Sequence, residues 1–152
     1  MPRAHALLIL LMQHYRRFDY RLSFFEIQKL AYLLQEQGEV LQLNFEGLYY
    51  GPYANNLRPL LQNMAGHFIS GLGDDENPER EIELLPGAVD EAEAYIGNDP
   101  VALSRLEEVS RLMDGYETPY GMELLTSVHW INLHEGIVDS LDVGPHPELV
   151  KT

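Results

Sequence analysis

The chain has 152 residues, no cysteine and a formal net charge of −14 at pH 7. The lack of cysteine excludes a disulfide framework and a thiol nucleophile, and the negative charge disfavours binding to nucleic acid or anionic lipid. Residues 1–70 carry six Lys/Arg and five Asp/Glu, whereas residues 71–152 carry four and nineteen. This asymmetry predicts a binding module whose partner is a basic protein surface.

Length and hydropathy predict one compact domain. A chain of this size with 45% hydrophobic residues can bury most of the surface that it exposes when unfolded. Its longest apolar run, residues 6–12, is far shorter than the roughly 18 residues of a membrane span, and no signal-peptide cleavage pattern follows it. We therefore expect a cytoplasmic protein with no membrane contact, a domain over residues 1–136, and a Pro/Gly-containing tail over residues 137–152 that is partly ordered at best.

The first elements along the chain have clear local signals. Apolar residues cover nearly the whole circumference of a helix over residues 4–12, which predicts a central helix. Ser23 and Glu26 form a capping-box pattern at the start of a second helix, which Gly38 ends. Alternating residues at 41–46 predict a half-buried strand, and residues 81–85 predict a second strand that pairs with it.

Four further helices are expected. The apolar spacing of residues 57–64 predicts one, with Pro59 either in its first turn or at a kink. Pro86, Pro100 and Pro119 each open another, because proline is tolerated in the first turn of a helix. Residues 71–79 are acidic and glycine-containing and predict a solvated loop. The fold class is therefore mainly α, a compact domain of about six helices with a small two-stranded antiparallel β element.

No motif in the sequence meets the geometry of a catalytic, cofactor or metal site. His129 and His134 lie five residues apart, whereas a zinc-binding helix places its histidines four apart on one face. Residues 71–73 contain two glycines but are followed by acids, which repel phosphate. Glu117 and Glu123 are typical of a helix N-terminus, where carboxylates are favoured by the helix dipole. We therefore predict that the chain is not an enzyme and takes no cofactor or metal.

Two groups of residues are candidates for contact with a partner. Tyrosines gathered around a Gly-Pro turn suit a protein interface, although at least one ring is expected to close the core; they are Tyr49, Tyr50 and Tyr53. The acidic candidates lie in the loop, the second strand and the helix that follows, and they are Asp74, Asp75, Glu76, Glu79, Glu81, Glu83, Asp90, Glu91 and Glu93.

Five sequence blocks cover most of residues 20–136. They are FEIQKLAYLLQE at 25–36, YGPYANNL at 50–57, GHFISG at 66–71, ELLPGA at 83–88, and ETPYGMELL at 117–125 with VHW at 128–130. In this order they resemble the C-terminal domain of DarG antitoxins. The Lys-Leu-x-Tyr helix followed by a Tyr-Gly-Pro turn is also similar, more loosely, to antitoxin domains of the SocA or Panacea type.

The resemblance implies that the chain binds and neutralises a DarT-type toxin, an enzyme that attaches ADP-ribose from NAD to thymidine in single-stranded DNA. DarG antitoxins also have an N-terminal macrodomain that reverses the modification. Nothing in this chain resembles a macrodomain, so the resemblance implies toxin binding here and a macrodomain elsewhere in the full-length protein.

Charge and resemblance together lead to the hypothesis of DNA mimicry, in which the acidic candidates replace phosphates and the tyrosines replace bases in the toxin's groove. Three alternatives remain open. The domain could be an adaptor or an antitoxin for another toxin, it could be a small ADP-ribose-related hydrolase, or its acids could serve only solubility.

Overall fold

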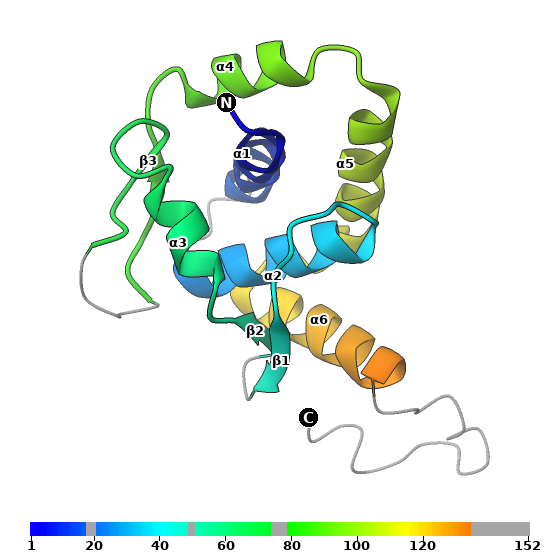
Figure 1. The fold of residues 1–152 in the computed structure, drawn as a ribbon. Coiled ribbons are helices and arrows are strands. Elements are labelled where there is room, and N and C mark those ends of the chain that lie inside the picture. The colour runs from blue at the N-terminus through cyan, green and yellow to red at the C-terminus, as the bar shows by residue number, and fades with distance from the viewer. Residues whose placement is uncertain (18–20, 49–50, 74–78, 135–152) are drawn as a thin grey trace, which may run out of the picture.

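The computed structural model describes residues 1–17, 21–48, 51–73 and 79–134. Within these ranges the fold is mainly α, as predicted, and it has two small antiparallel two-stranded sheets where one such element was expected (Figure 1). The elements in chain order are α1 (Arg3–Arg16), α2 (Phe24–Glu36), β1 (Phe45–Leu48), β2 (Gly51–Ala54), α3 (Leu57–Gln62), β3 (Ile69–Ser70), β4 (Glu83–Leu84), α4 (Ala88–Ile96), α5 (Pro100–Met113) and α6 (Pro119–His134).

Helix α1 forms the centre of the domain, which confirms the prediction for residues 4–12. It packs against α2, α4 and α5, and its residues 5–9 are all buried. An apolar circumference is stable only where other elements cover every side of a helix. Among the described helices, none is long and apolar enough to cross a membrane.

Helix α2 begins with the predicted capping box. The Ser23 main-chain N–H donates to Oε1 of Glu26 at 2.8 Å, and the Ser23 hydroxyl accepts from the Phe25 N–H at 3.2 Å. The helix ends before Gly38, whose φ of 107° is in the left-handed region, so this prediction is also confirmed. The buried side chain of Gln28 then binds both the N–H and the carbonyl of Ala54, which fixes β2 against α2.

The predicted pairing of residues 41–46 with 81–85 is wrong. Strand β1 pairs with its neighbour β2, and β4 pairs with β3. A hairpin between adjacent strands closes a short loop and costs less chain entropy than pairing across a long one. Side chains take the place of a strand partner for residues 41–44. The Gln35 side chain binds both the N–H and the carbonyl of Leu43 at 2.9 Å, and the Asn56 side chain accepts from the Asn44 N–H.

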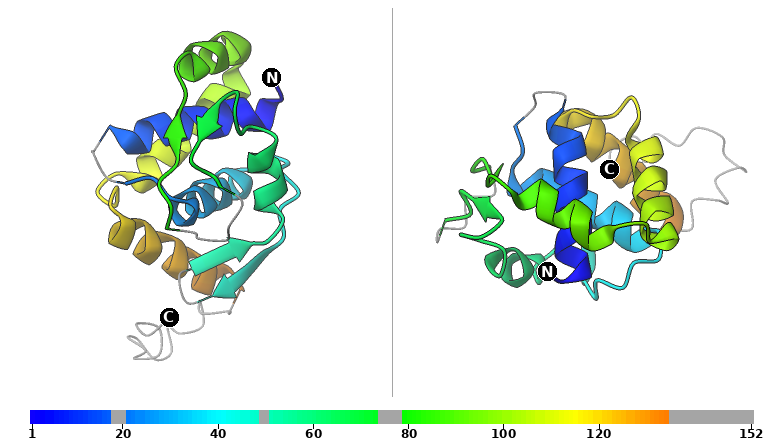
Figure 2. Two further views of the ribbon diagram at one scale, coloured as in Figure 1. Left: turned by 90° about the vertical axis from the view of Figure 1, so that its left-hand side faces the viewer. Right: turned by 90° about the horizontal axis from the view of Figure 1, so that it is seen from above.

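Helix α4 and the β1–β2 hairpin lie at opposite ends of the domain (Figures 1 and 2). Helix α4 packs on α1, whereas the hairpin packs on α2 and α6. The predicted tail at residues 137–152 lies outside the described residues.

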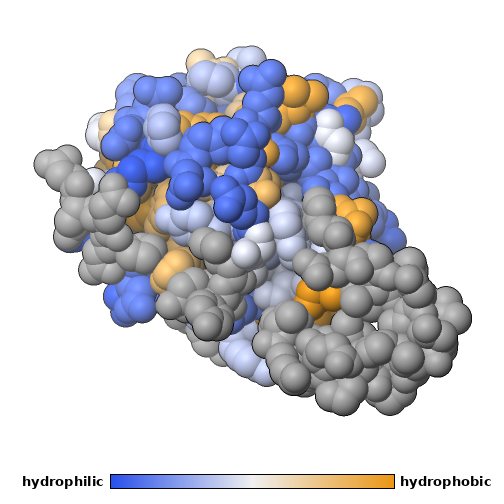
Figure 3. Space-filling model, turned by 60° about the horizontal axis from the view of Figure 1, so that its bottom comes forward, coloured by the Kyte–Doolittle hydropathy of each residue, from blue (hydrophilic) through white to orange (hydrophobic). Residues whose placement is uncertain are grey.

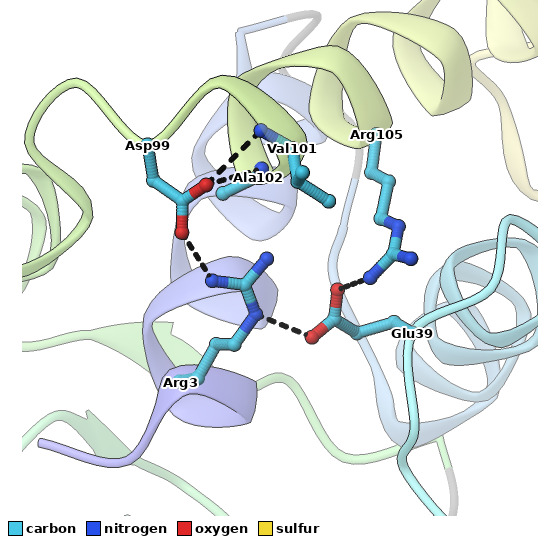
Figure 4. A network of polar contacts seen from close by, with 6 residues as sticks. All are labelled: Arg3, Glu39, Asp99, Val101, Ala102 and Arg105. Carbon is cyan, nitrogen blue, oxygen red and sulfur yellow. Dashed lines mark hydrogen bonds and ion pairs between the residues drawn. The ribbon is translucent and has the colours of Figure 1, made fainter.

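An ion network joins three segments that are distant in sequence (Figure 4). Nε of Arg3 donates to Glu39 Oε1, Nη1 of Arg3 donates to Asp99 Oδ2, and Nη1 of Arg105 donates to Glu39 Oε2, each at 2.6 Å. Asp99 also caps α5 by accepting from two main-chain N–H groups. Glu39 is only 6% exposed. Through its bonds to both arginines, the network ties the start of α1 and the first turns of α5 to the segment that follows α2.

Candidate functional site

The acidic candidates on α4 project into solvent. The helix turns Ala88, Ala92 and Ile96 into the core, and this four-residue spacing leaves the acids on its outer side. They are Asp90, Glu91 and Glu93, all exposed. One of them, Glu91, lies 3.6 Å from the His67 ring, which is itself exposed.

The acidic candidates before α4 lie along another side of the domain. Glu79, Glu81 and Glu83 are exposed, and Glu81 forms an ion pair with Arg16 at 3.0 Å. The Ser23–Glu81 bridge places this segment beside the start of α2. Asp74, Asp75 and Glu76 lie outside the described residues.

The aromatic candidates are separated from the acids of α4. Tyr53 is half-buried in β2, and its ring meets the ring of Phe24 edge-on with centroids 5.9 Å apart. It therefore belongs in part to the core, which was the alternative expected for at least one of the three tyrosines. Tyr49 and Tyr50 lie outside the described residues. The hairpin, which includes Tyr53, and α4, which carries three of the acids, lie at opposite ends of the domain (Figure 2).

A pocket that sequence reasoning missed opens between the N-terminal ends of α2 and α6. It holds about 380 Å³. Tyr120 and Glu123 of α6 line one part of it, Lys29 and Glu26 of α2 line another, and Glu79 reaches it from the segment before β4. The pocket thus combines carboxylates, aromatic surface and a buried amine.

Lys29 is unusual because it is only 3% exposed. Its ammonium donates to the Phe25 carbonyl at 3.3 Å and lies 5.5 Å from the centre of the Phe25 ring. Burial lowers the pKa of Lys29, while Glu26 and Glu123 act in the opposite direction. The sequence carried no signal for this burial: α2 has buried residues around its whole circumference from position 26 to 34, which is evident only once the helix is packed in the fold.

His129 contacts a tyrosine. The Tyr32 hydroxyl and His129 Nδ1 are 2.7 Å apart, and Tyr32 is fully buried. Burial raises the pKa of Tyr32, so its hydroxyl stays protonated. Among the described residues, no three His, Asp or Glu side chains gather in a way that could hold a metal.

Curated relatives connect the chain to one named group of proteins. It is 41% identical over 136 residues to a DNA ADP-ribosyl glycohydrolase of Thermus aquaticus, which is 90% of this chain and 38% of that protein. It is 39% identical over 121 residues to proteins of the same name from Mycobacterium bovis and Mycobacterium tuberculosis, which is 76% of this chain and 34% of each of them. No family model matches the chain.

These names correct one prediction. The expectation that the chain is not an enzyme is contradicted, because the relatives carry the name of an enzyme. That expectation depended on the lack of recognisable catalytic motifs, and catalytic groups that converge only in the folded protein need leave no motif in the sequence. The chain spans between 34% and 38% of the relatives' length and is related to one segment of the DNA ADP-ribosyl glycohydrolases.

Proposed function

We propose that this segment binds and neutralises a DarT-type DNA ADP-ribosyltransferase toxin by occupying the groove that holds its single-stranded DNA substrate. The observation that carries the proposal is the solvent exposure of those acidic candidates that the structure describes, in a segment related to DNA ADP-ribosyl glycohydrolases. Glu79 and Glu83 before α4 are exposed, and the exposed acids on α4 add to the negative field of the domain.

The physical basis is competition for one cationic groove. A protein that holds single-stranded DNA needs basic side chains for the phosphates and stacking surfaces for the bases. Exposed carboxylates form charge-assisted hydrogen bonds with the same Arg and Lys side chains. Opposite fields also accelerate encounter, most strongly at low salt.

A competition titration tests the proposal. The chain is titrated into a DarT-type toxin, with and without an excess of thymidine-containing single-stranded DNA, at two salt concentrations. We expect the DNA to displace the chain and the affinity to fall as salt rises. Simultaneous binding of both ligands without mutual displacement would overturn the mimicry, and failure to bind any such toxin would overturn the proposed partner.

A matched pair of variants locates the charge effect. Glu79 and Glu107 are both exposed, and Glu107 lies on α5. We expect Glu79→Lys to weaken toxin binding by at least about tenfold, a loss typical of removing a close charge pair. Glu107→Lys makes the same change in net charge and should have a much smaller effect. Equal effects of the two variants would show that only net charge matters.

A second candidate function follows from the relatives' enzyme name: the segment contributes to removal of ADP-ribose from DNA. Incubation of the chain with an ADP-ribosylated thymidine oligonucleotide, followed by chromatography of released ADP-ribose, tests it directly. Release that is proportional to protein concentration would assign glycohydrolase chemistry to this segment. The toxin titration is independent of that result, so either function can be rejected while the other is supported.

A further inference from the structure

Helix α6 leaves an apolar stripe uncovered. Tyr120, Leu124 and Val128 are 74%, 44% and 46% exposed. They are spaced four residues apart, so they lie along one side of the helix. The same helix buries Met122 and Thr126 completely, so a different side of α6 packs against the core.

The stripe leads into the pocket between α6 and α2. Tyr120 belongs to both, because it lines the pocket and begins the stripe. Single exposed apolar residues are common on protein surfaces, but three in a row along one helix beside a hollow are typical of an interaction site. Viewed from the lower end of Figure 1, the surface has separate hydrophobic patches within hydrophilic surroundings (Figure 3).

The charges beside the stripe favour a basic partner. Glu79 is exposed and Glu123 is half-buried, and both line the pocket. Of the two cations there, Arg21 donates to the main-chain carbonyl of Glu79 at 3.0 Å, and Lys29 is buried. The lining thus has three carboxylates, those of Glu26, Glu79 and Glu123, against two cations, so its net charge is negative.

We propose that the α6 stripe and the adjoining pocket form the surface on which the toxin docks, with a cationic side chain of the toxin held by Glu123 against the ring of Tyr120. The inference rests on the proposed function and deepens it by naming the surface and the chemistry of its partner. A guanidinium or ammonium group gains charge-assisted hydrogen bonds from the carboxylate and a cation–π contact from the ring. The apolar stripe then excludes water around this contact, as in an interface hot spot.

A pair of leucine substitutions tests the stripe. Leu124 on α6 and Leu103 on α5 are 44% and 45% exposed. Leu124→Asp should reduce toxin affinity at least about tenfold, since it places a desolvated charge in the contact, and Leu103→Asp should leave affinity within about twofold. Thermal melting of both variants is the control that tests whether each is folded.

A second variant tests the pocket without an apolar change. Glu123→Gln keeps the shape of the side chain and removes its charge, so it should weaken binding and reduce the dependence of affinity on salt. Leu124→Asp and Glu123→Gln variants that bind like the unmodified chain would overturn the surface while leaving toxin binding intact. If the unmodified chain does not bind the toxin, the proposed function fails and the surface fails with it.

Discussion

Gly47 of β1 lies directly against the indole of Trp130 on α6. A Cβ at Gly47 would be 2.6 Å from Nε1 and 3.1 Å from Cε2 of Trp130. The close approach of hairpin and helix therefore requires a residue without a side chain.

Gly47→Ala should destabilise the domain by about 1–3 kcal/mol, because one methyl group forces the indole or the hairpin to move. Chemical denaturation measures the change in the free energy of unfolding. The Trp130→Leu background provides the control: without the indole the clash is relieved, so Gly47→Ala should cost much less there. Equal costs in both backgrounds would show that the indole does not set the requirement.

The ion network at Glu39 should contribute to stability. Glu39→Gln removes the negative charge between Arg3 and Arg105, whose bonds to it are 2.6 Å long. We expect a loss of about 1–3 kcal/mol, the usual cost of leaving a buried polar group without its partner. Glu108→Gln is the comparison variant: Glu108 pairs with Arg111, which is 72% exposed, and an exposed pair contributes little.

The same carboxylate gives a pH dependence of known sign. Burial of Glu39 opposes its ionisation, but the hydrogen bonds from Arg3 and Arg105 outweigh burial and lower the pKa of this carboxyl. Its stabilisation is therefore complete above its unfolded pKa, about 4.3, and is lost as pH falls through the lower folded pKa. The stability difference between the unmodified chain and Glu39→Gln should shrink over that acidic window. A difference that stays constant would contradict the assignment.

Local signals were readable from the sequence and long-range ones were not. The capping box of Ser23 and Glu26 was predicted because both partners lie within one turn. The predicted strand pairing was wrong because side chains such as Gln35 bind the main chain in place of a partner strand. The periodicity of apolar residues does not reveal such side-chain bonds. The pocket was missed for a similar reason: Lys29 and Glu123 line one pocket only when α2 and α6 pack, and nothing in their sequence spacing indicates this.

The acids of α4 should act on the toxin through their field. Helix α4 lies at the end of the domain opposite the hairpin that packs on α6 (Figure 2), so Glu93 is remote from the proposed docking surface. Glu93→Lys should slow association at low salt and leave the dissociation rate unchanged. Leu124→Asp should mainly accelerate dissociation. Stopped-flow or surface-based kinetics separates the two, and a faster dissociation of Glu93→Lys would place α4 within direct contact.

Lys29 should make stability rise at alkaline pH. Because burial lowers its pKa in the folded state, the fold disfavours the ammonium relative to the unfolded chain. That penalty is present at neutral pH and disappears as pH rises from the folded pKa towards the unfolded value of about 10.4, since the amine is then neutral in both states. Lys29→Met retains a long side chain of similar shape but has no proton to lose. The free energy of unfolding of the unmodified chain should therefore increase relative to Lys29→Met between pH 7 and pH 10, while effects of other titrating groups cancel in the comparison. A difference that does not change over this range would mean that the ammonium is as well stabilised in the pocket as in water.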